Sequence, residues 1–319
     1  MLEKIANIKV FNDTFVDHLE AGQSKEAGVS AQSYTRNKLR ENSFAEKVIT
    51  PIDIANDELD KTEDPEMQVK WCSREPDQAP AQTIPLGTVP EGYQFKGTRY
   101  PAYFSRLVSP LFQKDVDKLR GYDYDIRQIL LENSTKDLAT QVDTKFIETV
   151  NSVMGQVNTA NALNGLGLPQ YVTISGGIDR DNLADSANVI KKLRVPFGPL
   201  QPDGSAAKGI MLLNNVTASE FLKFQRGEVG GDKSQDAYTS GLPPTEIMGI
   251  PALYTIKREL VPDGTIYFFS SEEFFGKYFR LQPLTVFMKT EAFFLQFFQY
   301  MNISMSIGNV KGCARVDFV

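Results

Sequence analysis

Apolar residues recur on one face of residues 122–155, and this spacing predicts a single long helix. The residues on that face are Ile126, Leu130, Leu138, Val142, Phe146, Val150 and Val153. Ser134 fills the one gap in the stripe, and Gly155 is expected to end the helix. At 1.5 Å per residue such a helix is about 50 Å long. A narrow stripe on so long a helix is typical of a structural spine.

Two segments before this helix alternate between apolar and polar positions, "EMQVKWCSREP" (66–76) and "GTRYPAYFSRLVS" (97–109). In the first segment Met67, Val69 and Trp71 share one side. In the second, Tyr100, Ala102, Phe104 and Arg106 lie opposite Pro101, Tyr103 and Ser105. Pro and Gly fill the stretch between the segments, so we predict a two-stranded hairpin over 66–106 with an irregular tip. A two-stranded ribbon is only marginally stable in water, which implies a partner surface.

Residues 160–260 alternate between strand and helix patterns. The expected strands are "QYVTIS", "KGIMLLN" and "IPALYTIKREL", and the expected helices are "DRDNLADSANVIKKLR" and "TASEFLKFQ". Asp179 or Asp181 is expected to cap the first helix, and Thr217 with Glu220 to form a capping box on the second. A long loop, 226–247, precedes the last strand, and loops of this length are usually functional or contact-making.

Residues 264–319 are rich in strand patterns, and one stretch among them is ambiguous. The expected strands include "GTIYFFS", "LTVFMKT" and "GCARVDFV", with a turn or short helix at "EEFFGKYF". The stretch "EAFFLQFFQYMNIS" (291–304) fits both periods. As a helix it has a polar stripe of Gln296, Gln299 and Asn302. As a strand its inner face is Phe293, Leu295, Phe297, Met301 and Ile303, with Gln299 as the exception.

The first 65 residues are polar, charged and poor in large apolar side chains. A short helix around 10–21 is expected, followed by an extended arm. A segment of this composition cannot build its own core, so it should become ordered only by lying on another surface.

Composition places the chain among ordinary soluble globular proteins, with 41% hydrophobic and 23% charged residues in 319. The net charge of −6 argues against a protein built mainly to hold nucleic acid. Cys72 and Cys313 lie far apart, which favours a reducing compartment over a disulfide framework. The N-terminus lacks the apolar core of a signal peptide, and no run of about 18 apolar residues predicts a membrane span.

Recognisable catalytic chemistry is missing from the sequence. His18 is the one histidine, and no zinc, phosphate-loop or EF-hand motif occurs. Gly165 and Gly167 lack the third glycine of a dinucleotide site and are read as a turn. Acidic pairs occur within 115–119, 121–125 and 179–185, and we interpret them as charged helix starts. We therefore predict no catalytic residue, no cofactor and no metal; an enzyme using such a pair or the loop 226–247 is the least favoured hypothesis.

The order of these parts resembles the major capsid proteins of tailed bacteriophages, which share the α+β HK-97-like fold. The resemblance covers nearly the whole chain, and it rests on "VKWCSREPDQAPAQTIPLG", "GIPALYTIKRELVPDGTIYFFS" and "FFQYMNISMSIGNVKGCARVDFV". It implies five parts: an N-terminal arm (1–65), an E-loop hairpin (66–106), a peripheral domain with the spine helix (107–159), an axial domain (160–260), and closing peripheral strands (261–319). The family has no invariant catalytic signature.

The resemblance also implies a function and partners. Subunits would assemble with one another, as hexamers and pentamers, into an icosahedral shell around the double-stranded DNA genome of a tailed phage. Assembly would take place in the host cytoplasm, and the product would be the virion capsid. A portal and in some cases a decoration protein would be partners. The family often carries a large N-terminal scaffolding segment that a protease removes, but here only about 65 residues precede the hairpin. We therefore expect a separate scaffolding protein and no removal of the N-terminus. An acidic chain suits weak, non-specific DNA contact. An encapsulin-type protein compartment is the alternative.

Specific contact residues follow from the same resemblance. Trp71, Tyr93, Phe95 and Tyr100 are expected hairpin contacts, because aromatic residues are enriched in interface cores, with local packing in the ribbon as an equal alternative. Gly230, Gly231, Pro243 and Pro244 would shape the axial loop. The resemblance favours a strand for 292–306, with its phenylalanines buried against Phe146, Val150 and Val153 or their neighbours on that helix. Lys96 lies near the hairpin, but we assign it no cross-linking chemistry.

Overall fold

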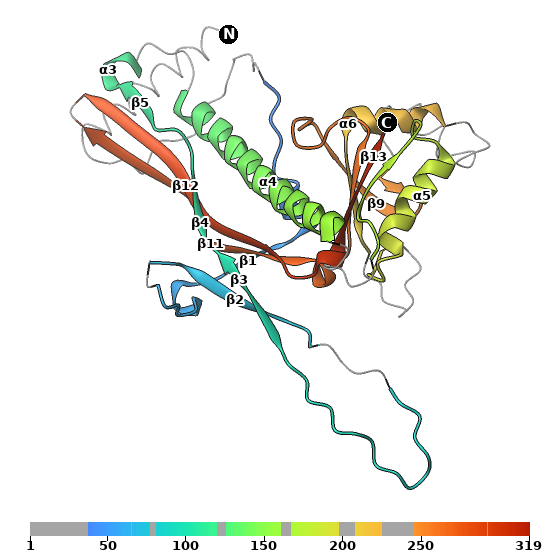
Figure 1. The fold of residues 1–319 in the computed structure, drawn as a ribbon. Helices are drawn as coiled ribbons and strands as arrows, with labels where there is room; N and C mark the ends of the chain where they lie inside the picture. Colours follow the sequence, from blue (N-terminus) through green and yellow to red (C-terminus); the bar gives the residue numbers. More distant parts are fainter. Residues whose placement is uncertain are drawn as a thin grey trace.

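Two β-sheets and one long helix organise the molecule (Figure 1). The computed structural model describes residues 38–64, 66–76, 81–119, 126–160, 167–197, 208–224, 245–291 and 293–319. The predicted helix at 10–21, His18 and most of the predicted loop 226–247 therefore lie outside the described residues. So do Gly230, Gly231, Pro243 and Pro244.

The first sheet has five strands built around a long antiparallel hairpin. β11 (Gly276–Glu291) pairs with β12 (Phe294–Ile307), and β1 (Pro51–Asp53) lies parallel to β11. On its other side β12 pairs with β4 (Ser105–Val108) and then with β5 (Phe112–Asp115). Segments from the start, middle and end of the chain thus meet in this sheet.

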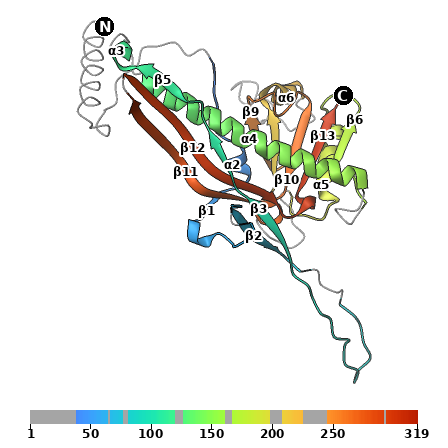
Figure 2. The same ribbon diagram turned by 60° about the vertical axis from the view of Figure 1, so that its left-hand side comes forward.

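The predicted spine helix is confirmed as α4 (Ile126–Ala160), which lies along β12 in both ribbon views (Figures 1 and 2). The predicted end at Gly155 is wrong, because the helix continues to Ala160. A glycine inside a helix costs only about 1 kcal/mol, so neighbouring residues can carry the helix through it. The buried side chains on its inner face are Ser134, Leu138, Val142, Asp143, Phe146, Ile147, Val150 and Met154.

The ambiguous aromatic stretch is a strand, and the one polar residue on its inner face matches a polar residue on the helix. Gln299 of β12 is 3% exposed, and its amide oxygen accepts hydrogen bonds from Ser134 (2.7 Å) and Thr135 (3.2 Å). Ser134 is the gap in the apolar stripe of α4. The two exceptions to the hydrophobic pattern therefore satisfy each other, as buried polar groups must.

The predicted burial of the phenylalanines in this strand is mostly wrong. Phe293 is 73% exposed and Phe294 is 41% exposed, whereas Phe297 is buried. Phe297 packs near the start of α4, and Phe146 and Val150 share their cluster with Met301 and Ile303 instead. Four residues of strand span about 13 Å, so Phe297 meets an earlier turn of the helix than Met301 does.

The second sheet has six strands in the order β6-β13-β10-β7-β9-β8. These are β6 (Tyr171–Ile174), β13 (Cys313–Phe318), β10 (Thr265–Phe269), β7 (Ile210–Asn214), β9 (Ile250–Thr255) and β8 (Glu246–Ile247). Apolar residues of α5 (Arg180–Lys191) cover one face, and α4 shares a core cluster with residues of the other. The segment 261–319, predicted as one set of closing strands, contributes to both sheets.

Helix capping agrees with the prediction at one helix and differs at the other. Asp179 caps α5, where its carboxylate accepts a hydrogen bond from the Asn182 amide at 2.7 Å. The predicted cap Thr217 is wrong: α6 (Asn215–Glu220) starts directly from β7, and Asn214 accepts from the Thr217 amide at 2.6 Å. The Thr217 hydroxyl instead accepts from the amide of Gly264.

The predicted hairpin is present as β2 (Val69–Arg74) paired with β3 (Thr98–Tyr103). Tyr100, Ala102 and Phe104, which were predicted to share one side of β3, pack together toward Phe279. The grouping predicted for the first segment is wrong in part: Val69 and Cys72 are buried, while Met67 and Trp71 are exposed. The hairpin also ends before residue 106, because the chain enters the five-stranded sheet at β4.

Short helical turns complete the described chain. They are α2 (Ala45–Val48), η1 (Asn56–Glu58), α3 (Val116–Leu119), η2 (Phe221–Lys223), η3 (Glu272–Phe274) and η4 (Val310–Gly312). η3 falls where a turn or short helix was predicted, within "EEFFGKYF".

Candidate assembly surfaces

Beyond β2 and β3 the hairpin projects from the body as an irregular loop (Figures 1 and 2). Residues 81–97 form no helix or strand, and every side chain among them is exposed. The large apolar side chains on this loop are Ile84, Leu86, Val89, Tyr93 and Phe95. Val89 is 89% exposed and Phe95 is 71% exposed. Large apolar side chains that are exposed together on one projecting segment are typical of an interaction site.

The four hairpin residues singled out from the sequence have different surroundings. Tyr93 and Phe95 lie on the projecting loop, and Trp71 is exposed at its base. Tyr100 is seated against the body, where its hydroxyl lies so close to Gly308 that a Cβ on that residue would overlap it. Burial, with a smaller contribution from the neighbouring Cys72 thiol, raises the pKa of Tyr100 to about 12. Tyr100 thus anchors the hairpin, and its role as a contact between subunits stays a prediction.

Further exposed apolar side chains lie toward the far end of the β11–β12 hairpin, on both faces of its strands. They are Leu111, Val286, Phe287, Phe293 and Phe294. Phe287 packs on Phe298 across the two strands, with 5.1 Å between ring centroids. The sequence analysis missed these exposed side chains because it read the whole aromatic run as core. Strand alternation was the available signal, since it places Phe294 and Phe298 on the face opposite Phe297.

A buried carboxylate on α4 holds residues 43–45, which belong to the first described segment of the chain. Asp143 is fully buried, and it accepts hydrogen bonds from the Ser43 hydroxyl (2.6 Å) and the amides of Ala45 (2.9 Å) and Phe44 (3.3 Å). It also forms an ion pair with Lys257. Asp143 therefore serves the free amides at the start of α2 as a capping residue would, from a different helix.

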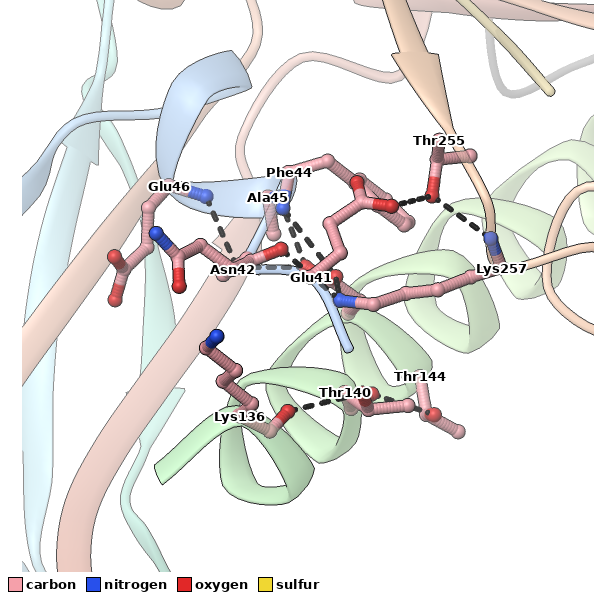
Figure 3. Close-up of polar contacts among 12 residues, drawn as sticks. Glu41, Asn42, Phe44, Ala45, Glu46, Lys136, Thr140, Thr144, Thr255 and Lys257 are labelled. Carbon is pink, nitrogen blue, oxygen red and sulfur yellow. Dashed lines mark hydrogen bonds and ion pairs between the residues drawn. The ribbon is translucent and has the colours of Figure 1, made fainter. Parts of the chain in front are cut away.

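Further contacts tie the same segment to the end of β9 (Figure 3). Glu41 accepts hydrogen bonds from the Ile256 amide (2.8 Å) and the Thr255 hydroxyl (3.2 Å). The Lys257 ammonium also donates to the Asn42 carbonyl at 3.1 Å. This junction joins the arm, the spine helix and the six-stranded sheet. The sequence analysis missed Asp143; its place beside Val142, inside the apolar stripe, was the only local signal.

The described residues offer little reactive chemistry. They contain no group of three His, Cys, Asp or Glu side chains placed to hold a metal. Within the same residues, no helix is long and apolar enough to cross a membrane. Both cysteines are buried, and burial raises the pKa of Cys313 to about 12, so its thiol stays protonated and unreactive. Of the acidic pairs, Asp179 is a helix cap, and residues 121–125 lie outside the described chain.

The sequence matches no protein-family model and no curated protein. Solved structures do match over nearly the whole chain. The capsid of cyanophage P-SCSP1u gives a TM-score of 0.63 at 11% identity, covering 92% of this chain and 96% of that one. The mature capsid of bacteriophage PhiM1 gives a TM-score of 0.62 at 9% identity and covers 93% of this chain and 94% of that one. The capsid of a native GTA particle gives a TM-score of 0.58 at 12% identity and covers 95% of this chain and 98% of that one. The chain therefore has the HK-97-like fold predicted from the order of its parts.

Proposed function

We propose that this protein is the major capsid protein of a tailed bacteriophage, a structural subunit and not an enzyme. Copies of the chain assemble as hexamers and pentamers into an icosahedral shell that encloses double-stranded DNA. The observation that carries the proposal is the projecting loop 81–97, whose apolar side chains have no core of their own. The likeness to solved phage capsids over more than nine tenths of the chain supports it.

The parts of the fold take roles in this proposal. The hairpin of β2, β3 and the loop 81–97 is the E-loop, which lies on a neighbouring subunit. The five-stranded sheet with α4 is the peripheral domain, and the six-stranded sheet is the axial domain. Residues 1–65 are the arm, whose last part is anchored at Asp143. Leu86 and Val89 join Trp71, Tyr93 and Phe95 among the proposed contacts, because their side chains are highly exposed.

The partners follow from the same role. The shell is built with a separate scaffolding protein in the host cytoplasm and closes around a portal, and a decoration protein is a further candidate. Its contact with packaged DNA is weak and non-specific, since the chain carries a net charge of −6. An encapsulin-type compartment would share the fold but would hold protein cargo in place of DNA.

The proposal is tested by expressing the chain with and without its scaffolding protein and measuring particle mass by sedimentation and electron microscopy. A matched variant replaces residues 75–97 by Asn-Gly, which links Arg74 to Thr98 through a two-residue turn. We expect closed particles of megadalton mass from the wild type, and folded subunits without closed particles from the variant. A wild-type chain that stays monomeric under every condition contradicts the function, and normal particles from the variant contradict the hairpin assignment.

A further inference from the structure

A cleft of about 880 Å³ opens where the base of the hairpin meets the body. Its walls come from the end of β2, the turn after α5, the start of β11 and the turn around η4. The charged side chains that line it are Arg74, Arg194, Lys277 and Lys311, with Glu75 and Glu273. None of these six forms an ion pair within the part of the chain that the structure describes. The cleft thus presents four cations and two carboxylates, and none of them is held in an ion pair among the described residues.

The wall that carries two of these cations is held rigidly. The Asn309 side chain donates to the Phe274 carbonyl (3.0 Å) and accepts from the Lys311 amide (3.1 Å), and the Asn309 amide donates to the Phe275 carbonyl (3.0 Å). The neighbouring Gly308 packs against Tyr100 of the hairpin so closely that no side chain would fit. The cleft is therefore preformed, as binding sites usually are.

Arg194 is a second, independent sign that the cleft has a role. Its φ of +59° lies in the left-handed region, just after the end of α5, where glycine is the usual residue. A side chain costs free energy in this conformation, and strained residues of this kind cluster at functional sites. Here the strained residue places a guanidinium on the cleft.

The same chain exposes an acidic segment that matches the cleft. Residues 57–66, which we call the acidic turn, contain one base, Lys61, among the acids Asp57, Glu58, Asp60, Glu63, Asp64 and Glu66. The turn is fixed to the start of β2, because Asp60 forms a β-bridge with Val69 and accepts from the Trp71 amide at 2.7 Å. Among the described residues, none of its carboxylates is in an ion pair.

The two surfaces follow one another along one strand. The acidic turn is attached to the first half of β2, between Val69 and Trp71, and the cleft starts at Ser73. No ion pair joins the two surfaces in the described chain. We propose that the acidic turn of one copy docks into the basic cleft of the next. Two different patches on each copy make this a head-to-tail contact, which repeats around a ring.

The charge pattern favours a polypeptide over DNA as the occupant. Glu75 and Glu273 would repel a phosphate backbone, which carries negative charge only. They suit the acidic turn, because Lys61 can lie beside them. This contact rests on the proposed shell function and names residues of one interface within it.

A charge-swap experiment tests the contact. The cleft variant is Arg74→Glu with Lys277→Glu, the turn variant is Glu63→Lys with Asp64→Lys, and a third chain carries all four changes. Lys191→Glu with Lys192→Glu, two exposed lysines outside the cleft, is the matched control. We expect the cleft and turn variants to lower particle yield at least tenfold at low salt, with recovery in the four-fold variant and no change in the control. Urea midpoints of the unassembled subunits check that every variant folds.

Chemical cross-linking of wild-type particles tests the same contact without substitutions, so it applies even if a charge-swap variant fails to fold. Particles assembled from an equal mixture of ¹⁴N and ¹⁵N chains are treated with a carbodiimide, which joins lysines directly to carboxylates. We expect Lys277 or Lys311 to be joined to residues 57–66 in pairs of mixed isotope. Joining to another segment, or only within one copy, overturns the proposal.

The remaining outcomes separate this contact from the function it rests on. Suppose that wild-type particles form, but the chain with all four changes gives no higher particle yield than the cleft variant or the turn variant. The contact is then refuted, while the shell function stands. Acetylation of Lys277 that is blocked only in DNA-filled particles would identify phosphate as the occupant and also refute it. Failure of the wild type to form any particle refutes the function first.

Discussion

Replacing Asp143 by Ala should be among the most destabilising single changes in the subunit. The carboxylate is fully buried, pairs with Lys257, whose side chain is 8% exposed, and accepts three hydrogen bonds from Ser43, Phe44 and Ala45. Removing one partner of a buried ion pair costs about 3–5 kcal/mol, because the other charge stays buried and alone. We expect a loss in this range, since the amides at the start of α2 also lose their acceptor.

Asp137→Ala provides a matched control on the same helix. Asp137 also pairs with an arm residue, Arg40, at 3.0 Å, but its side chain is 54% exposed. An exposed pair contributes about 0–1 kcal/mol, so the same substitution two turns earlier should change stability little. Lys257→Met should lie between the two, since Asp143 keeps its hydrogen bonds from the arm.

Urea unfolding of the unassembled subunit measures these losses. With a slope of about 3 kcal/mol per molar urea, the expected loss at Asp143 lowers the midpoint by about 1–2 M. Proteolysis of the native subunit should also begin earlier around residues 41–46, because the junction that holds them is broken. Equal midpoint shifts for Asp143→Ala and Asp137→Ala would refute the reasoning.

Two further substitutions should change the stability of the subunit in opposite directions. Burial raises the pKa of Asp317, but hydrogen bonds from Arg315, Tyr171 and Thr265 outweigh it and hold the pKa below its ordinary value. Asp317→Asn should therefore cost about 1–3 kcal/mol at pH 7. The gap to wild type should shrink as the pH falls below about 4, where the wild type loses this contribution; a gap in urea midpoint that is constant from pH 7 to 3 would be inconsistent with this. Arg194→Gly should stabilise the unassembled subunit by about 1 kcal/mol through relief of the left-handed strain, while lowering particle yield. A lower melting temperature of the subunit would count against it.

The elements that the sequence predicted well are those whose pattern is long. The stripe on α4 extends over many turns, so one glycine and one serine could not hide it. The strands of the six-stranded sheet follow from short apolar runs between helix signals, and Asp179 marked its helix because a cap acts within three residues. The aromatic stretch needed a resemblance to decide between helix and strand, since local spacing fits both.

The features that sequence reasoning missed depend on distant contacts. Cys72, and not Trp71, faces inward on β2 because Phe279 lies on that side, some two hundred residues along the chain. Asp143 is buried because three segments meet there. The helix pattern predicts a surface position for an aspartate, so it could not indicate this burial. The cleft and the acidic turn involve six separate segments of the chain, so their charges could not be associated before the fold was known.

A cryo-electron microscopy reconstruction of particles formed by the expressed chain tests the central claim most directly. The account predicts a closed icosahedral shell in which the loop 81–97 lies on a neighbouring subunit, with Leu86, Val89 and Phe95 buried in that contact. Particles in which this loop remains free in solvent, or preparations that contain only monomers, would contradict it.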